Sequence, residues 1–133
     1  MWVGKVNVAE TTEKLTRIGE VKVTSYNAEV GQTDSTPCIA GGTGINVCER
    51  ARNGDRVIAL SQDLLAWSVK PKNKIKAFSK NEKVYLKQID GNDHRCNGWF
   101  SVVDAMNYRY NNRADLFFLK RSDNTSCRAE IFF

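Results

Sequence analysis

Short runs of apolar and β-branched residues recur along the chain, and residues typical of turns separate them. Residues 20–26, EVKVTSY, alternate apolar and polar side chains with the two-residue period of a half-buried strand. The sequence shows no alternation of strands with long helices. It therefore predicts a mainly β chain of six to eight short strands and one or two short helices, closed into a small barrel because closure removes exposed edges. The other strand-like runs lie at 2–8, 56–60, 74–79, 82–88, 99–104, 115–118 and 129–133.

Two segments differ from the strand pattern. Residues 27–46 are rich in Gly, Thr, Asp and Pro, and an irregular stretch of this length inside a compact domain is usually functional. Residues 61–67 begin with Ser61 as a helix N-cap and place Asp63 in the first turn, where a negative charge suits the helix dipole. With 133 residues the chain is expected to be one domain. We assign 1–19 to an N-terminal arm or linker and 20–133 to the barrel.

The N-terminal residues do not resemble a targeting segment. No apolar run approaches the roughly 20 residues that span a bilayer, and no continuous apolar segment of a signal peptide is present. Either the chain is not exported by that route, or its N-terminus is a boundary inside a longer precursor.

Four cysteines bear on the cellular compartment. Their wide spacing and the absence of a CxxC pair disfavour a structural zinc site, so no metal is expected. An even count in a small, loop-rich chain fits two disulfides formed in an oxidising compartment. Of the three possible pairings we favour Cys38–Cys48 with Cys96–Cys127, because the first pair brackets one glycine-rich loop. Four reduced, buried thiols in a cytosolic protein remain the alternative.

The chain is basic, with 20 Lys and Arg against 15 Asp and Glu and a formal net charge of +5. Such a surface attracts polyanions in general, including nucleic acid, lipid headgroups and acidic cell-wall polymers. The basic residues are scattered, however, and no dense block marks a nucleic-acid arm. Solubility is the simplest explanation, and nucleic acid is not expected as a partner.

The stretch 99–118, WFSVVDAMNYRYNNRADLFF, contains two acids at strand ends. An apolar run ends on Asp104, a polar and aromatic loop follows, and a second apolar run starts at Asp115. Loops on a rigid scaffold often carry function, but acids are also common as plain polar ends of strands. Taken alone, the stretch leaves both interpretations open.

Catalysis in this chain has to rest on carboxylates. The single histidine, His94, lies in a polar loop, and no GxSxG pattern is present. The GGTG stretch lacks the lysine of a phosphate-binding loop. An acid at the end of an apolar strand can be partly desolvated, which raises its pKa and lets it donate a proton near neutral pH. The candidate acids are Asp34, Asp63, Asp104 and Asp115.

Three segments, in this order, resemble the 3D (three-aspartate) domain. They are VTSYNAEVGQTDSTPCIAGGTG, RVIALSQDLL and VVDAMNYRYNNRADLFF. That domain is a double-psi β-barrel similar to the catalytic barrel of membrane-bound lytic transglycosylase A, and more distantly to the RlpA and expansin barrels. The resemblance covers about residues 20–118. It implies a six-stranded double-psi barrel.

The resemblance also implies roles for individual residues. Asp104 matches the proposed catalytic acid/base, and Asp115 matches the acid that opens the next strand. The sequence departs from the family at Ala105, where Thr is common, and in the MNYRYNNR turn. Aromatic and basic residues of this turn are candidates to contact sugar rings and carboxylates. The expected substrate-binding residues are Thr24, Tyr26, Asp34, Asp63, Tyr108 and Arg109.

The implied activity is cleavage of glycan strands in peptidoglycan without hydrolysis. Asp104 would protonate the oxygen between N-acetylmuramic acid and N-acetylglucosamine and then take the proton of the muramyl C6 hydroxyl, closing a 1,6-anhydro ring. The alternative is a non-catalytic, expansin-like barrel that binds wall polysaccharide. We expect a secreted or wall-associated monomer that needs no cofactor and has no membrane span.

Overall fold

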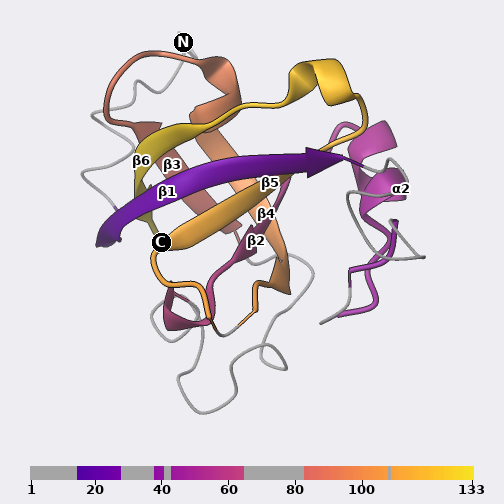
Figure 1. Cartoon of the computed structure of the whole chain (residues 1–133), viewed down its shortest axis with the longest axis horizontal. Helices are drawn as coiled ribbons and strands as arrows, with labels where there is room; N and C mark the ends of the chain where they lie inside the picture. The colour runs from indigo at the N-terminus through magenta and orange to yellow at the C-terminus, as the bar shows by residue number, and fades with distance from the viewer. Residues whose placement is uncertain (1–14, 28–37, 41–42, 65–82, 108) are drawn as a thin grey trace, which may run out of the picture.

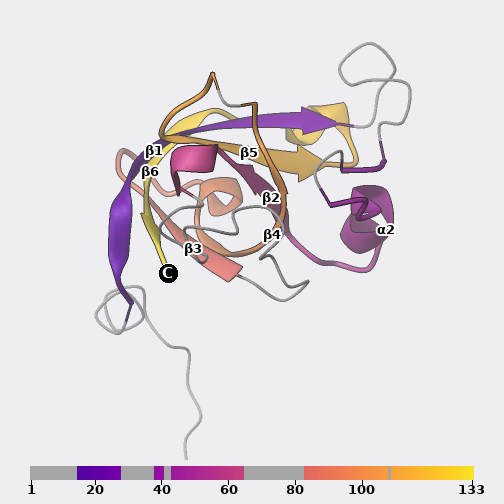
Figure 2. The same cartoon turned by 90° about the horizontal axis from the view of Figure 1, so that it is seen from below.

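Six strands form a closed barrel in a computed structural model of the chain, which describes residues 15–27, 38–40, 43–64, 83–107 and 109–133. The strands follow the order β1-β5-β2-β4-β3-β6 around the barrel (Figure 1), and the view in Figure 2 shows them as a ring. The mainly β, closed-barrel fold class is therefore confirmed. The strands are β1 (Arg17–Asn27), β2 (Val57–Leu60), β3 (Lys83–Gln88), β4 (Gly98–Ala105), β5 (Arg113–Phe118) and β6 (Cys127–Phe132).

The barrel consists of two topologically equivalent halves, β1–β3 and β4–β6. The pairs β1–β5 and β2–β4 are parallel, and all other neighbours are antiparallel. Exchanging β1 with β4, β2 with β5 and β3 with β6 leaves the strand order and every direction unchanged. This arrangement is compatible with a double-psi barrel.

The predicted strand alternation fills the barrel interior with apolar side chains. Val21 and Val23 of β1 are buried there, whereas Lys22 between them is exposed. β3 pairs with β4 and β6. The predicted strands at 74–79 and 2–8 lie outside the described residues. The interior cluster comprises Val21, Val23, Ile58, Leu60, Leu64, Val84, Leu86, Phe100, Val102, Ala114, Leu116, Ala129 and Ile131.

A second apolar cluster covers part of the outer face. The helix α2 (Val47–Arg52) lies outside the barrel near the end of β1 (Figure 1) and buries Val47 and Cys48 against Val57 and Phe117. The side chain of Asn46 caps the helix by accepting a hydrogen bond from the N–H of Glu49 at 3.0 Å. Ala40 and Val103 complete the buried part of this outer cluster.

The two disulfides are those that the spacing favoured. Cys38–Cys48 ties the chain before α2 to the helix, and Cys96–Cys127 ties the short 3-10 helix η2 (His94–Cys96) to β6. Among the described residues no cysteine is free. The pairing is therefore confirmed, and two disulfides indicate an oxidising, extracytoplasmic environment.

Several boundaries differ from the sequence-based expectation. β1 begins at Arg17 and β5 at Arg113, so Asp115 lies inside its strand and does not open it. The segment expected to be a helix over 61–67 is helical at 62–64, beyond which the description stops. A 3-10 helix, η3 (Arg121–Asp123), lies in the turn before β6. Within the described ranges, no helix combines the length and apolarity required to cross a bilayer.

Candidate functional site

Both predicted acids lie in one row across four adjacent strands on the outer face of the barrel. Thr24 of β1 pairs with Asp115 of β5, Asp115 pairs with Ala59 of β2, and Ala59 pairs with Asp104 of β4. We call these four residues the outer acid row. Neighbouring strands are about 4.8 Å apart, which puts the Cα atoms of the two acids about 10 Å apart. The small side chain of Ala59 separates them.

A β-bulge turns Asp104 outward. Ile58 pairs with Val102, but the next residue of β2, Ala59, pairs with Asp104, so that Val103 is the extra residue. Val102 is buried in the barrel interior, and strict alternation would send Asp104 to the same side. The hydroxyl of Thr43 donates a hydrogen bond to the carbonyl of Val103 and braces the bulge. At the bulge, Val103 and Asp104 therefore both face the outer side of the barrel.

Asp115 has a raised pKa. Burial raises the pKa of this carboxyl from 3.8 to about 6, and a hydrogen bond from the Thr24 hydroxyl to Oδ1, 3.0 Å long, acts in the opposite direction. Asp115 is therefore a carboxyl that holds its proton under mildly acidic conditions.

Tyr26 lies close to both acids. Its ring packs edge-on against Phe117, with the ring centroids 5.1 Å apart. Burial, followed by the negative charges of Asp115 and Asp104, raises the pKa of its hydroxyl well above the usual range. The hydroxyl therefore keeps its proton at physiological pH and is able to donate a hydrogen bond.

A local hydrogen bond contributes to the orientation of Asp104. Its Oδ1 accepts a hydrogen bond from the N–H of Ala105 at 2.9 Å. The side chain of Ala105 packs against the barrel interior. A threonine at this position would thus direct its side chain inward, and the departure from the family at Ala105 does not remove a side chain from the outer face.

Asp63 and Ser61 hold the loop between β4 and β5. Both carboxylate oxygens of Asp63 accept from the N–H of Asn112, at 3.0 and 3.2 Å, and Ser61 Oγ accepts from the N–H of Arg113 at 3.0 Å. Asn112 has a positive φ of 51°, a conformation that these contacts fix. Ser61 directly precedes the helical residues 62–64, the position predicted for the N-cap, and its hydroxyl also contacts β5. The geometry gives Asp63 a role in positioning the loop.

Of the remaining predicted residues, one is exposed and two lie outside the described residues. Arg109 is exposed in the β4–β5 loop, where its N–H donates to Oδ1 of Asn107. Asp34 and Tyr108 lie outside the described residues. His94 is exposed over 93% of its side chain, as expected for a solvated loop residue. Among the described residues, no group of three His, Cys, Asp or Glu side chains forms a metal site.

Three residues that shape the site were missed by sequence reasoning. Ala59 lies between the acids, Val103 forms the bulge and Thr43 braces it. Ala59 does have a sequence signal, since it is the one small residue in the otherwise bulky run VIAL. The bulge has none, because the run SVVDA is equally consistent with regular alternation.

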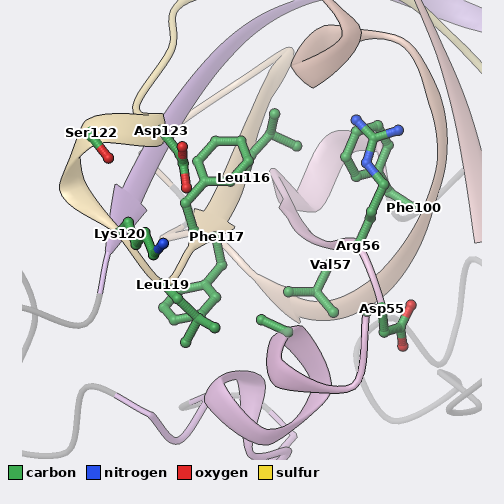
Figure 3. Close-up of a pocket in the computed structure, with 13 residues that line it drawn as sticks. Asp55, Arg56, Val57, Phe100, Leu116, Phe117, Leu119, Lys120, Ser122 and Asp123 are labelled. Carbon is green, nitrogen blue, oxygen red and sulfur yellow. The ribbon is translucent and has the colours of Figure 1, made fainter.

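Apart from the outer acid row, a hollow of about 400 Å³ lies at the start of β2 and the end of β5, and we call it the second hollow. Figure 3 shows Val57, Leu116 and Phe117 around it, with Arg56 stacked on the ring of Phe100, 4.1 Å from its centroid. The guanidinium of Arg56 donates to the carbonyls of Asn97 and His94, at 2.7 Å each. None of the residues predicted for the site lines this hollow.

Comparisons with known protein families, with curated proteins and with solved structures each find no match. The function of the chain therefore has to be inferred from its own residues.

Proposed function

We propose that the outer acid row cleaves glycosidic bonds in peptidoglycan glycan strands, in the manner of a lytic transglycosylase. One observation carries the proposal: a partly buried carboxyl with a pKa of about 6, Asp115, lies on the same face as a second acid, Asp104, with only Ala59 between them. Enzymes that break glycosidic bonds commonly use a pair of carboxyl groups, one of which keeps its proton because burial raises its pKa.

The two acids divide the proton transfers. Asp115, protonated, donates its proton to the glycosidic oxygen as the bond from that oxygen to C1 of the muramyl sugar breaks. Asp104, as carboxylate, takes the proton of the C6 hydroxyl, whose oxygen closes on C1 to give the 1,6-anhydro ring. Exchange with solvent then returns a proton to Asp115 and removes one from Asp104. Neither water nor a cofactor enters the reaction.

This division modifies the mechanism implied by the family resemblance, in which Asp104 alone acts first as acid and then as base. The reason is the pKa of Asp115, which suits a general acid working near neutral pH. Asp104, held by the N–H of Ala105, is oriented to act as the base. The hydroxyl of Tyr26 donates a hydrogen bond to the sugar between them.

The order of the sequence motifs and the topology of the barrel support membership in the 3D domain family. The three sequence motifs occur in the family's order, and the barrel has two equivalent halves joined by two parallel strand pairs, each with one strand from either half, an arrangement compatible with a double-psi barrel. Two disulfides support action outside the cytoplasm, where the wall is located.

Product release from purified peptidoglycan tests the function. We expect the unaltered protein to release fragments with 1,6-anhydro ends, identified by mass. Asp104→Asn and Asp115→Asn should each lower the rate by at least about 100-fold, the contribution expected of a positioned acid or base. Asp123→Asn makes the same chemical change at an exposed acid beside the second hollow and should leave the rate unchanged.

Two outcomes would count against this function. Unchanged release by either active-site variant would remove that residue from the mechanism. Sedimentation of the protein with the wall, without any soluble product from the unaltered protein, would identify the chain as a non-catalytic wall-binding barrel.

A further inference from the structure

Three basic side chains form a second row on the outer face, next to the outer acid row. Arg128 of β6 pairs with Lys22 of β1, and Lys22 pairs with Arg113 of β5. Thr24 and Asp115 follow two residues later on the same two strands, so they share this face and lie about 7 Å further along it. We call Arg128, Lys22 and Arg113 the cationic row.

The cationic row lines an open hollow of about 710 Å³. Its rim is fixed by backbone contacts: the N–H of Lys22 donates to the carbonyl of Asn112 at 2.9 Å, and Asp63 holds the N–H of Asn112. The side chains of Asn111 and Asn112 also line the hollow and add amide donors. The hollow is therefore a built feature of the barrel surface, positioned by the same loop that follows Asp104.

The charges in this row are incompletely compensated. Like charges directly opposite one another on neighbouring strands are destabilising. Arg128 forms ion pairs with Glu20 at 3.3 Å and with Asp90 at 3.2 Å. In the part of the chain that the structure describes, no ion pair includes Lys22 or Arg113, and the guanidinium of Arg113 lies 5.7 Å from the ring centroid of Tyr110. An anionic ligand would relieve the repulsion between these two cations.

We infer that the cationic hollow binds an anionic group, a carboxylate, that the glycan carries next to the bond cut by the outer acid row. The inference rests on the proposed function for the identity of the polymer. The inference adds a requirement on the substrate. The glycan strand has to carry a negative charge about 7 Å from the position of Asp115, and a neutral glycan would lack this contact. The row spans only three strands, which suits one charged substituent better than the extended phosphate backbone of a nucleic acid.

Sedimentation with purified peptidoglycan tests the inference. Every protein carries Asp104→Asn, so the wall is not cut during the measurement. We compare native wall, wall with its carboxylates amidated, and wall stripped of phosphate polymers. Amidation should weaken binding about tenfold, the loss expected for one charge-assisted contact, and removal of phosphate should have no effect. The double variant Lys22→Gln/Arg113→Gln should bind native wall about tenfold more weakly and show no further loss on amidated wall.

The control is Arg52→Gln/Lys120→Gln, which removes the same charge from exposed positions at α2 and near the second hollow. It should retain the full difference between native and amidated wall. The inference is overturned if Lys22→Gln/Arg113→Gln keeps that difference, if removal of phosphate abolishes binding, or if single-stranded DNA competes at physiological salt. Because binding is read without cleavage, its result is independent of whether the unaltered protein releases products.

Discussion

The two parallel strand pairs, β1–β5 and β2–β4, each join one strand from each half of the barrel and are equivalent to one another, yet they present their acids differently. In β1–β5 the register is regular, and Asp115 is partly buried with a hydrogen bond from Thr24. In β2–β4 a bulge interrupts the register, and Asp104 lies opposite the small Ala59. The same topology thus yields one carboxyl that keeps its proton through burial and a second that a bulge directs to the outer face.

Deleting Val103 removes the irregularity that distinguishes β2–β4 from β1–β5 and should have the largest effect. Without the extra residue Asp104 directly follows Val102, so it stays opposite Ala59 and faces outward, whereas the outer cluster loses the buried side chain of Val103. The loss of this side chain and of the contact from Thr43 should lower the free energy of unfolding by several kcal/mol, while the folded protein keeps its activity. Urea denaturation and product release measure the two effects.

A milder variant tests the bulge if the deletion does not fold. Thr43→Val removes the hydroxyl that braces the carbonyl of Val103 and should lower the free energy of unfolding by about 1 kcal/mol and activity about tenfold. Thr16→Val, at an exposed position, is its control. Full activity in Thr43→Val would show that the bulge does not depend on this contact.

Replacing Asp115 should stabilise the fold while removing activity. Its pKa is higher in the folded protein, about 6, than its ordinary value of 3.8, so the folded state binds more protons between these pH values and loses stability as pH rises through them. At pH 7 this costs about 3 kcal/mol. Asp115→Asn keeps an oxygen to accept from Thr24 and avoids the cost.

Urea denaturation at several pH values measures this effect. The two proteins should have similar unfolding free energies near pH 3, and the variant should be more stable by up to about 3 kcal/mol at pH 7. Equal stability at pH 7 would mean that Asp115 is not desolvated in the folded protein.

The barrel could be predicted from the sequence. Alternation of apolar and polar residues indicates which side of a strand is buried, and turn residues mark where strands end. The course of β1 and the disulfide pairing Cys38–Cys48 followed from such local patterns. The short helix α2 was missed, although Asn46 followed by Glu49 three residues later has the spacing of a helix N-terminus.

The site could be predicted from the sequence only in part. The sequence singled out both acids, but alternation from Phe100 and Val102 would have sent Asp104 inward, since a bulge is set by pairing with β2 and leaves no local mark. The assignment of the raised pKa to Asp115 also depends on burial by distant strands. Asp63 matched a family motif, yet its contacts to Asn112 arise only when the 61–64 turn meets the β4–β5 loop.

The central claim, that Asp115 donates the proton and Asp104 accepts one, is tested most directly by the pH dependence of product release in Thr24→Val. In the unaltered protein the rate should fall as pH rises through about 6, because only protonated Asp115 can act as the acid. Removing the Thr24 hydroxyl destabilises the carboxylate, so the fall should move upward by about one pH unit. The same fall at the same pH in both proteins would contradict the assignment of the acid to Asp115.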